Sequence, residues 1–221
     1  ASSNYLTGVA AFSYSCASPL PSGSGNVSAN PLFADSAAGD YRLSLGSPCI
    51  DSGTAASAPT NDLAGLPRPL DGDTNGVAAV DMGSYEFIHN RGDSDGDGAG
   101  DVFELANGFN PTNGGDGVLD PDGDRRSNAD EYVAGTDPTN INSVLTIDSV
   151  GGADAGVSYN VVNWRGVPGR LYKIWSATNM GGPWSDHPGF GEAPGIDGAM
   201  SFTNASPYPL EFHRVKVRLL P

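Results

Sequence analysis

Apolar and polar residues alternate through the last third of the chain, and this is the clearest pattern in the sequence. A period of two predicts strands with one buried face. Turn signals such as Gly151-Gly152 and Pro168-Gly169 separate these segments, so we expect a small β-sandwich. Its expected strands are 144–150, 157–165, 170–177, 199–203 and 211–219. In the last of them, Val215, Val217 and Leu219 alternate with Arg214, Lys216 and Arg218, which we expect on a solvated face.

The first third of the chain has shorter apolar runs between turns, at 8–14, 41–45 and 80–87. The segment 3–14 alternates like a strand and contains neither charge nor proline. A strand of this kind suits donation to an incomplete sheet of another copy through main-chain hydrogen bonds. Pairing within its own chain is the equally simple alternative, because sequential strands usually neighbour each other.

Composition narrows the classes of function. The 221 residues carry 26 acidic and 11 basic side chains, a formal net charge of −15. This balance argues against nucleic acid and anionic membranes as partners. With 38% hydrophobic residues, 8 Phe, 8 Tyr and 3 Trp, the chain is not disordered overall. Since no run of about 18 apolar residues occurs, we expect no insertion into a membrane.

The charge is concentrated in the middle of the chain. Residues 92–142 contain twelve acids and two bases, whereas 1–91 contain eight and three, and 143–221 contain six of each. Carboxylates at this density repel one another unless a cation neutralises them. These boundaries define the three expected domains: a mainly β first region, an acidic segment and the sandwich.

The acidic segment is a tandem repeat. Residues 93–113 align without a gap with 120–140, and nine of the 21 positions are identical. The spacing of acidic residues matches a calcium-binding loop, with ligands at positions 1, 3, 5, 7, 9 and 12 and a backbone carbonyl at position 7. In the first loop these positions are Asp93, Asp95, Asp97, Ala99, Asp101 and Glu104. In the second loop they are Asp120, Asp122, Asp124, Arg126, Asn128 and Glu131.

The donor types favour calcium, because Ca²⁺ takes six to eight oxygen ligands in a flexible cage, whereas zinc prefers Cys or His. We therefore expect two Ca²⁺ sites. Position 6 needs a sharp turn, and it is Gly98 in the first loop but Arg125 in the second, so the second site is expected to be weaker. Short amphipathic helices are expected at 102–107 and 129–134. A solvated acidic linker is the alternative interpretation.

Three resemblances follow from these motifs. The acidic segment resembles the thrombospondin type 3 and dockerin-like calcium repeats of bacterial surface proteins. The ordered phrases 30–33, 39–43, 46–53, 65–69 and 80–86 resemble the C-terminal closing region of bacterial right-handed parallel β-helix proteins. The phrases 167–172 and 212–215 look like a C-terminal module of large secreted bacterial proteins. The resemblances imply a β-helix-like N-terminal cap region and an extracellular or cell-surface location in a bacterium.

Two sets of residues allow more than one interpretation. Cys16 and Cys49 predict one disulfide in an extracellular chain, with two buried free thiols as the alternative. Trp164, Trp175 and Trp184 are expected to fill the sandwich core and its rim, although planar rings also stack on surface polysaccharides.

No catalytic constellation is apparent in the sequence. The three histidines, His89, His187 and His213, are far apart along the chain, and no nucleophile elbow occurs. We therefore expect a secreted, calcium-stabilised, non-catalytic structural protein that self-assembles head to tail into a filament by strand donation. The alternative is the non-catalytic, calcium-binding anchoring tail of a polysaccharide-acting β-helix enzyme.

Overall fold

The structure is a computed structural model that describes residues 12–154, 157–204 and 211–221. The chain divides into two compact units, Ala1–Leu119 and Asp120–Pro221, and this division falls between the two acidic repeats. The fold is mainly β, with two short helices in the described part of the chain, which confirms the expected class.

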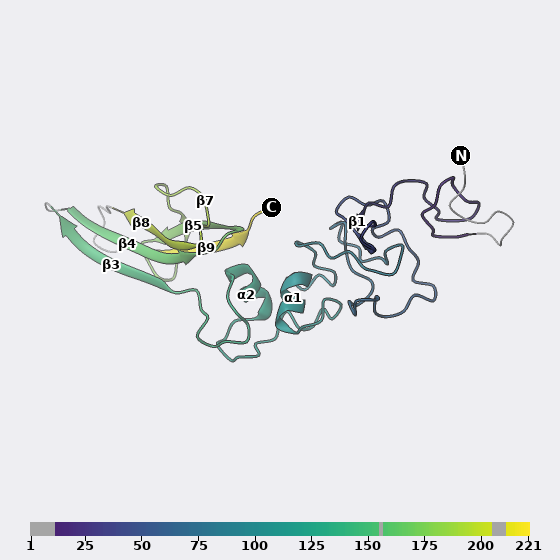
Figure 1. The fold of residues 1–221 in the computed structure, drawn as a ribbon. Coiled ribbons are helices and arrows are strands. Elements are labelled where there is room, and N and C mark those ends of the chain that lie inside the picture. Colours follow the sequence, from purple (N-terminus) through teal and green to yellow (C-terminus); the bar gives the residue numbers. More distant parts are fainter. Residues whose placement is uncertain (1–11, 155–156, 205–210) are drawn as a thin grey trace. The chain divides into compact units, whose positions relative to one another are not determined.

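The second unit contains two antiparallel sheets (Figure 1). In the first sheet, β4 lies between β3 and β8. In the second sheet, β5 pairs with three strands, β6, β7 and β9. The strands of the first sheet are β3 (Ile147–Asp154), β4 (Val157–Gly166) and β8 (Gly198–Asn204). Those of the second sheet are β5 (Arg170–Ala177), β6 (Ser185–Asp186), β7 (Ala193–Pro194) and β9 (Phe212–Leu219).

One hydrophobic cluster joins the two sheets. Its buried members come from β4, β5 and β8, and they are Val162, Trp164, Tyr172, Ile174 and Phe202. Val215 and Val217 of β9 pack against this cluster, as their alternation predicted. Trp164 is therefore a core residue.

The basic side chains of β9 contact aromatic and acidic side chains of the same unit. The Arg214 guanidinium stacks 3.8 Å from the ring centre of Trp184, and the Lys216 ammonium lies 4.5 Å from that of Trp175. Arg218 forms an ion pair of 2.8 Å with Glu192. These contacts cover part of both indole rings with cations.

The predicted turn at Gly151-Gly152 is wrong. The two glycines lie inside β3, which pairs with β4 as far as Asp154 opposite Val157. Pairing with β4 overrides the turn preference of these residues, because strand propensity depends strongly on the neighbouring strand. The short strands β6 and β7 have too few residues to give a periodic signal.

Regular pairing is sparse in the first unit. A hairpin of β1 (Phe33–Asp35) and β2 (Asp40–Leu43) lies within the expected N-terminal region, and three isolated bridges accompany it among the described residues. The apolar run at 80–87 contains no strand, while most of the segments 3–14 and 8–14 lies outside the described residues. The backbone of this unit is held largely by side chains.

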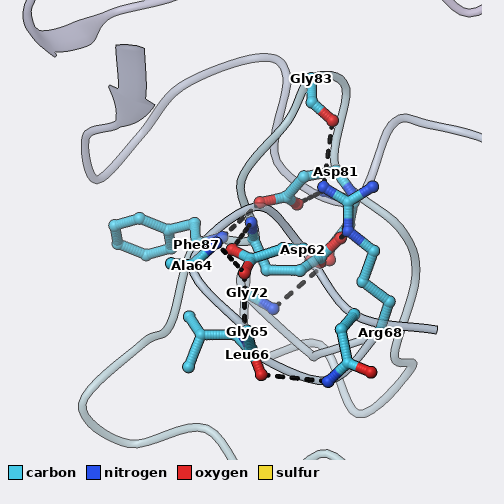
Figure 2. Close-up of polar contacts among 12 residues, drawn as sticks. Asp62, Ala64, Gly65, Leu66, Arg68, Gly72, Asp81, Gly83 and Phe87 are labelled. Atoms are coloured by element: carbon cyan, nitrogen blue, oxygen red, sulfur yellow. Dashed lines mark hydrogen bonds and ion pairs between the residues drawn. The ribbon is translucent and has the colours of Figure 1, made fainter. Parts of the chain in front are cut away.

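A buried polar network shows how this works (Figure 2). Asp62 accepts hydrogen bonds from the backbone N–H groups of Ala64, Leu66 and Glu86, at 2.7, 2.8 and 3.0 Å. Asp81 accepts from the N–H groups of Asp51 and Phe87. These two carboxylates link loops that are 20 or more residues apart, which sheet ladders would otherwise do.

Arg68 completes the network. Its guanidinium lies 2.9 Å from the buried Glu86 carboxylate and donates a hydrogen bond of 3.0 Å to the carbonyl of Gly83 (Figure 2). Both side chains of the ion pair are almost fully buried. A buried charge needs such a partner, because its desolvation is otherwise very costly.

The structure differs from the predicted disulfide and has Cys16 and Cys49 as free thiols. The two residues belong to one hydrophobic cluster with Leu43, Ile50 and Met82. The Cys16 thiol donates to the carbonyl of Ala29 at 3.3 Å. Burial, and then contact with Cys16, raises the pKa of Cys49 to about 11, which keeps its thiol protonated.

Each of the two helices begins one residue before its predicted start and ends at the predicted residue. They are α1 (Asp101–Asn107) and α2 (Asn128–Ala134). Gly108 and Gly135 end them in the left-handed conformation, at φ 80° and 75°. Neither helix is long and apolar enough to cross a membrane.

We expect Arg68→Ala to destabilise the first unit by about 3–5 kcal/mol, because it leaves the Glu86 charge buried without its partner. Chemical denaturation followed by circular dichroism measures this loss. Arg42→Ala is the matched control, since Arg42 pairs with Asp40 at the surface, and it should change stability little. Equal effects of the two substitutions would contradict a structural role for the buried pair.

Candidate metal centres

The two acidic loops follow the same backbone path. Position 4 has φ of 76° at Gly96 and 81° at Gly123, and position 6 has φ of 95° at Gly98 and 76° at Arg125. Arg125 thus adopts the left-handed conformation that the loop pattern requires of position 6. A non-glycine residue is strained there, by about 1 kcal/mol or more.

The carboxylate at position 1 organises each loop. Asp93 accepts hydrogen bonds from the N–H groups of Gly96 and Gly98, at 2.9 and 3.1 Å. Asp120 accepts from Gly123 and Arg125, at 2.8 and 2.9 Å. Both oxygens of position 1 therefore hold the turn in each repeat.

At positions 3 and 5, one carboxylate oxygen accepts a hydrogen bond from the backbone N–H two residues further along the chain. Asp95 accepts from the N–H of Asp97 at 3.2 Å, and its counterpart Asp122 accepts from Asp124 at 3.0 Å. Asp97 and Asp124 accept in the same way from position 7, which is Ala99 at 2.9 Å and Arg126 at 2.7 Å. The second oxygens of Asp95, Asp122 and Asp124 are buried without a hydrogen bond.

Position 12 brings a buried glutamate from each helix. Glu104 in α1 is 0% exposed, and neither of its carboxylate oxygens has a hydrogen bond. Burial first, and then the nearby charges of Asp95 and Asp97, raise its pKa to about 9. A carboxylate in this position is unfavourable unless a cation or a proton neutralises it.

Glu131 in α2 is the counterpart of Glu104. It is 1% exposed, and its carboxylate oxygens are buried without a hydrogen bond of normal geometry. Burial raises its pKa, while the Thr136 hydroxyl lowers it in part. The second repeat therefore has a buried glutamate at the same position, and Thr136 compensates its burial only in part.

In the first repeat, four carboxylates converge. Asp95, Asp97, Glu104 and Asp116 each present an oxygen within 4.8 Å of the others, and such a group could hold a metal ion. Asp116 was not among the predicted ligands, because it lies outside the loop, beyond the helix α1 that follows it. It is buried, and its second oxygen accepts a hydrogen bond of 3.1 Å from the N–H of Asn110.

A longer comparison of the repeats could have found Asp116. At the same offset of 27, the second repeat has Ser143, whose hydroxyl accepts from the N–H of Asp137 at 2.9 Å. Asp137 is the counterpart of Asn110, so both residues secure the same turn. The repeated unit therefore extends to 93–116 and 120–143, and only the first copy gains a carboxylate at its end.

The segment after α1 folds back onto its own loop. The N–H of Gly117 donates to the second oxygen of Asp97, and a Cβ at Gly117 would come 2.5 Å from this carboxylate. Any other residue at this position would require the Asp97 side chain to shift. Asp116 is therefore placed beside the loop by the backbone around it.

In the second repeat, Asp120, Asp122 and Asp124 present oxygens within 4.8 Å of one another. Position 9 differs between the repeats. Asp101 lies outside the converging group, because its carboxylate accepts from the N–H and the hydroxyl of Ser94, both at 2.7 Å. Its counterpart Asn128 is buried at the start of α2.

A third acidic group consists of Asp51, Asp71 and Asp73. Backbone N–H groups already donate to each of its carboxylates, including those of Asn75 and Gly76 to Asp71 at 3.1 and 2.8 Å. This group therefore differs from the two repeats, in which buried oxygens have no donor.

We expect Glu104→Gln to stabilise the metal-free protein, although it removes a donor of the candidate site. The pKa of Glu104 is about 9 in the fold, above its usual value, so stability is lost as pH rises from about 4.5 through about 9. The advantage of the glutamine variant over the unsubstituted protein should grow over this range. Urea unfolding in chelator at several pH values measures the difference. A constant or reversed difference would contradict the assigned burial of this carboxyl.

No protein-family model, curated protein or solved structure matches this chain. What the repeats bind therefore has to be inferred from their donor atoms, their charge and their burial.

Proposed function

We propose that the two repeats bind Ca²⁺ and that calcium stabilises a non-catalytic structural protein. The carrying observation is the pair of buried glutamates at position 12, whose oxygens have no hydrogen bond in either repeat. Asp95, Asp122 and Asp124 each add one buried oxygen without a hydrogen bond. Four carboxylates converge in the first repeat, and a divalent cation is the simplest way to neutralise their negative charge.

The donor set supports calcium over other ions. The converging side-chain donors are carboxylate oxygens, which suit hard cations. Mg²⁺ requires a near-ideal octahedron and keeps several waters, whereas Ca²⁺ accepts the irregular cages that loops provide. Zn²⁺ would prefer nitrogen or sulfur donors.

The two sites are unequal in this proposal. The first has Gly98 at position 6 and the additional carboxylate of Asp116, whereas the second has the strained Arg125 and Ser143. The number of charged ligands is a main determinant of calcium affinity in such loops. The first site is therefore the tighter one.

Each site is tied to the rest of its unit, so binding stabilises more than a loop. In the first unit, the Ser94 hydroxyl accepts from the N–H of Asp71 and donates to Asp101 at the start of α1. In the second unit, the Arg170 side chain of β5 donates to the carbonyls of Tyr132 and Val133 at the end of α2. Calcium that orders these loops would also hold the helices against their own units.

For the architecture, we propose the closing region of a β-helix in the first unit and a β-sandwich in the second. The single core shared by two antiparallel sheets supports the sandwich. The resemblances noted above, rather than the strand pairing, support the β-helix. They also support secretion to a bacterial cell surface.

Self-assembly into a filament is the proposed role of the whole chain. An open groove of about 800 Å³ in the first unit is lined in part by Phe33, Tyr41, Leu63 and Tyr85. Tyr41 is 55% exposed and Leu63 is 72% exposed, which leaves an apolar surface to be covered. A donated strand with the pattern of residues 3–14 would cover it in the next copy.

Calorimetric titration with Ca²⁺ tests the ion. We expect two binding events, each with a Kd of about 10⁻³ M or tighter. Asp95→Ala and Asp122→Ala should each remove one event. Asp116→Asn should weaken only the tighter event, by roughly one to two powers of ten, because it removes one ligand charge. Asp197→Asn, at an exposed position, is the control. An unchanged tight event in the Asp116 variant would show that this residue is no ligand.

Electron microscopy with and without chelator tests assembly. We expect polymers of the full chain in calcium and their loss when residues 1–12 are deleted, with both calcium-binding events preserved. Strand donation is wrong if the truncated protein forms the same polymers. A full chain that stays monomeric at high concentration in calcium excludes the filament altogether.

A further inference from the structure

A second kind of metal-binding group lies in the described part of the second unit, away from the acidic loops. His187, Glu211 and His213 each present a donor atom within 4.8 Å of the other two. His187 follows β6, whereas Glu211 and His213 lie at the start of β9. The fold therefore brings together two imidazoles and a carboxylate that are separated by more than 20 residues in sequence.

The distances leave a gap between these groups. The Nε2 atom of His187 lies 3.8 Å from one Glu211 carboxylate oxygen, and the Nε2 atom of His213 lies 3.9 Å from the other. Both separations are too long for hydrogen bonds. Donors around a tetrahedral zinc ion lie about 3.3 Å apart, given its bond lengths of about 2.0–2.1 Å. The gap therefore fits a small cation after a minor adjustment of the side chains.

The group is buried and has a polar atom that is not satisfied. The side chains of His187, Glu211 and His213 are 8%, 12% and 6% exposed. The Nε2 atom of His213 is buried and has no hydrogen bond. A buried imidazole nitrogen without a partner is unfavourable, and a metal ion at the centre of the group would satisfy it.

Neighbouring side chains orient and enclose the three residues. The Asn204 amide donates a hydrogen bond of 2.7 Å to Glu211, which fixes the orientation of the carboxylate. Partners of this kind commonly orient metal-ligating side chains. The Phe202 ring packs against both imidazoles, with ring centres 4.7 Å from His187 and 6.1 Å from His213. An apolar wall on this side limits access of water.

One hydrogen bond opposes binding at His187. Its Nδ1 atom accepts from the N–H of Gly189 at 3.0 Å, so in the neutral ring the proton is on Nε2. Coordination through Nε2 moves this proton to Nδ1 and breaks the bond to Gly189. His187 is therefore the weakest of the three ligands, and Glu211 and His213 define the centre.

The geometry points to a transition-metal site, of the class that Zn²⁺ occupies, formed by His187, Glu211 and His213. Two imidazoles and one carboxylate are a donor set that suits zinc, with water as the remaining ligand. The nitrogen donors distinguish this centre from the all-oxygen loops. Its position between the end of β6 and the start of β9 would let the ion join two segments of the second unit.

Imidazole NMR spectra provide the test, because the chain has only three histidines. Zn²⁺ is titrated into the full chain with Ca²⁺ in excess, so that the acidic loops are occupied. We expect one equivalent of zinc to shift the signals of His187 and His213 together. His89 is the internal control, since it lies in the first unit, where its Nδ1 accepts from the N–H of Arg91.

Variants separate the ligands from the positioning residue. His213→Ala should abolish the shift of His187, and Asn204→Ala should weaken zinc binding by about 10–100-fold while leaving the stoichiometry at one. His89→Ala should have no effect. His213→Gln replaces the alanine variant if that variant fails to fold.

The proposal is overturned if His213 does not respond, if His213 responds without His187, or if all three histidines shift in parallel. The last result would mean that zinc binds weakly to surface imidazoles. A response to pH alone, with none to zinc, would identify the group as a hydrogen-bonded histidine pair bridged by water.

Discussion

Burial of carboxylates close to one another, with too few hydrogen-bond donors, is the constraint on which the proposed function depends. Glu104 is fully buried close to Asp95 and Asp97, and its pKa is raised to about 9, chiefly by burial. The loop does not relieve this cost, because backbone N–H groups occupy only one oxygen of Asp95. The raised pKa of Glu131, again chiefly from burial, repeats this arrangement in the second loop and supports the proposal of a neutralising cation in each repeat.

Hydrogen bonds from backbone N–H groups to aspartate carboxylates have a different role in the rest of the first unit. Asp62 and Asp81 also accept several backbone N–H groups, yet there the result is a closed network with Arg68 and Glu86. Asp71 likewise has backbone donors on both oxygens. Aspartate therefore replaces strand pairing in this unit. Glu86 also keeps one buried oxygen without a hydrogen bond, but its other oxygen pairs with Arg68, whereas both carboxylate oxygens of Glu104 are buried without a hydrogen bond. The contrast between satisfied and unsatisfied carboxylates is what distinguishes a scaffold from a candidate ion site.

Features encoded by local spacing could be predicted from the sequence. Helices were expected at 102–107 and 129–134, and the structure has them at Asp101–Asn107 and Asn128–Ala134. The sharp turn expected at position 6 is present in both loops, with a positive φ at Gly98 and Arg125. Alternation in β9 correctly placed Val215 and Val217 on the core side. These predictions succeeded because one turn or one strand decides each of them.

Features that depend on distant contacts were missed. Asp116 lies beside the first loop, where the N–H of the next residue, Gly117, donates to Asp97 and the N–H of Asn110 donates to Asp116 itself. His187 and His213 appeared isolated in the sequence, and the pairing of β5 with β6 and β9 brings them together. Cysteine count and cellular location predicted a disulfide, but the burial of Cys49 and the bond from Cys16 to Ala29 correspond to two thiols. Contacts between residues that are far apart in the chain cannot be predicted from a local sequence pattern.

The division of the chain gives the two repeats separate consequences. The boundary at Leu119 and Asp120 leaves one loop in each unit, so each ion would act on the unit that contains its loop. The repeats have kept the same backbone bonds at positions 1, 3 and 5, whereas they differ at position 6 and at Asp116 and Ser143. Since ligand charge and backbone strain both favour the first loop, the two units would order at different calcium concentrations. If the proposed calcium binding holds, rising calcium would stabilise the first unit at a lower concentration than the second.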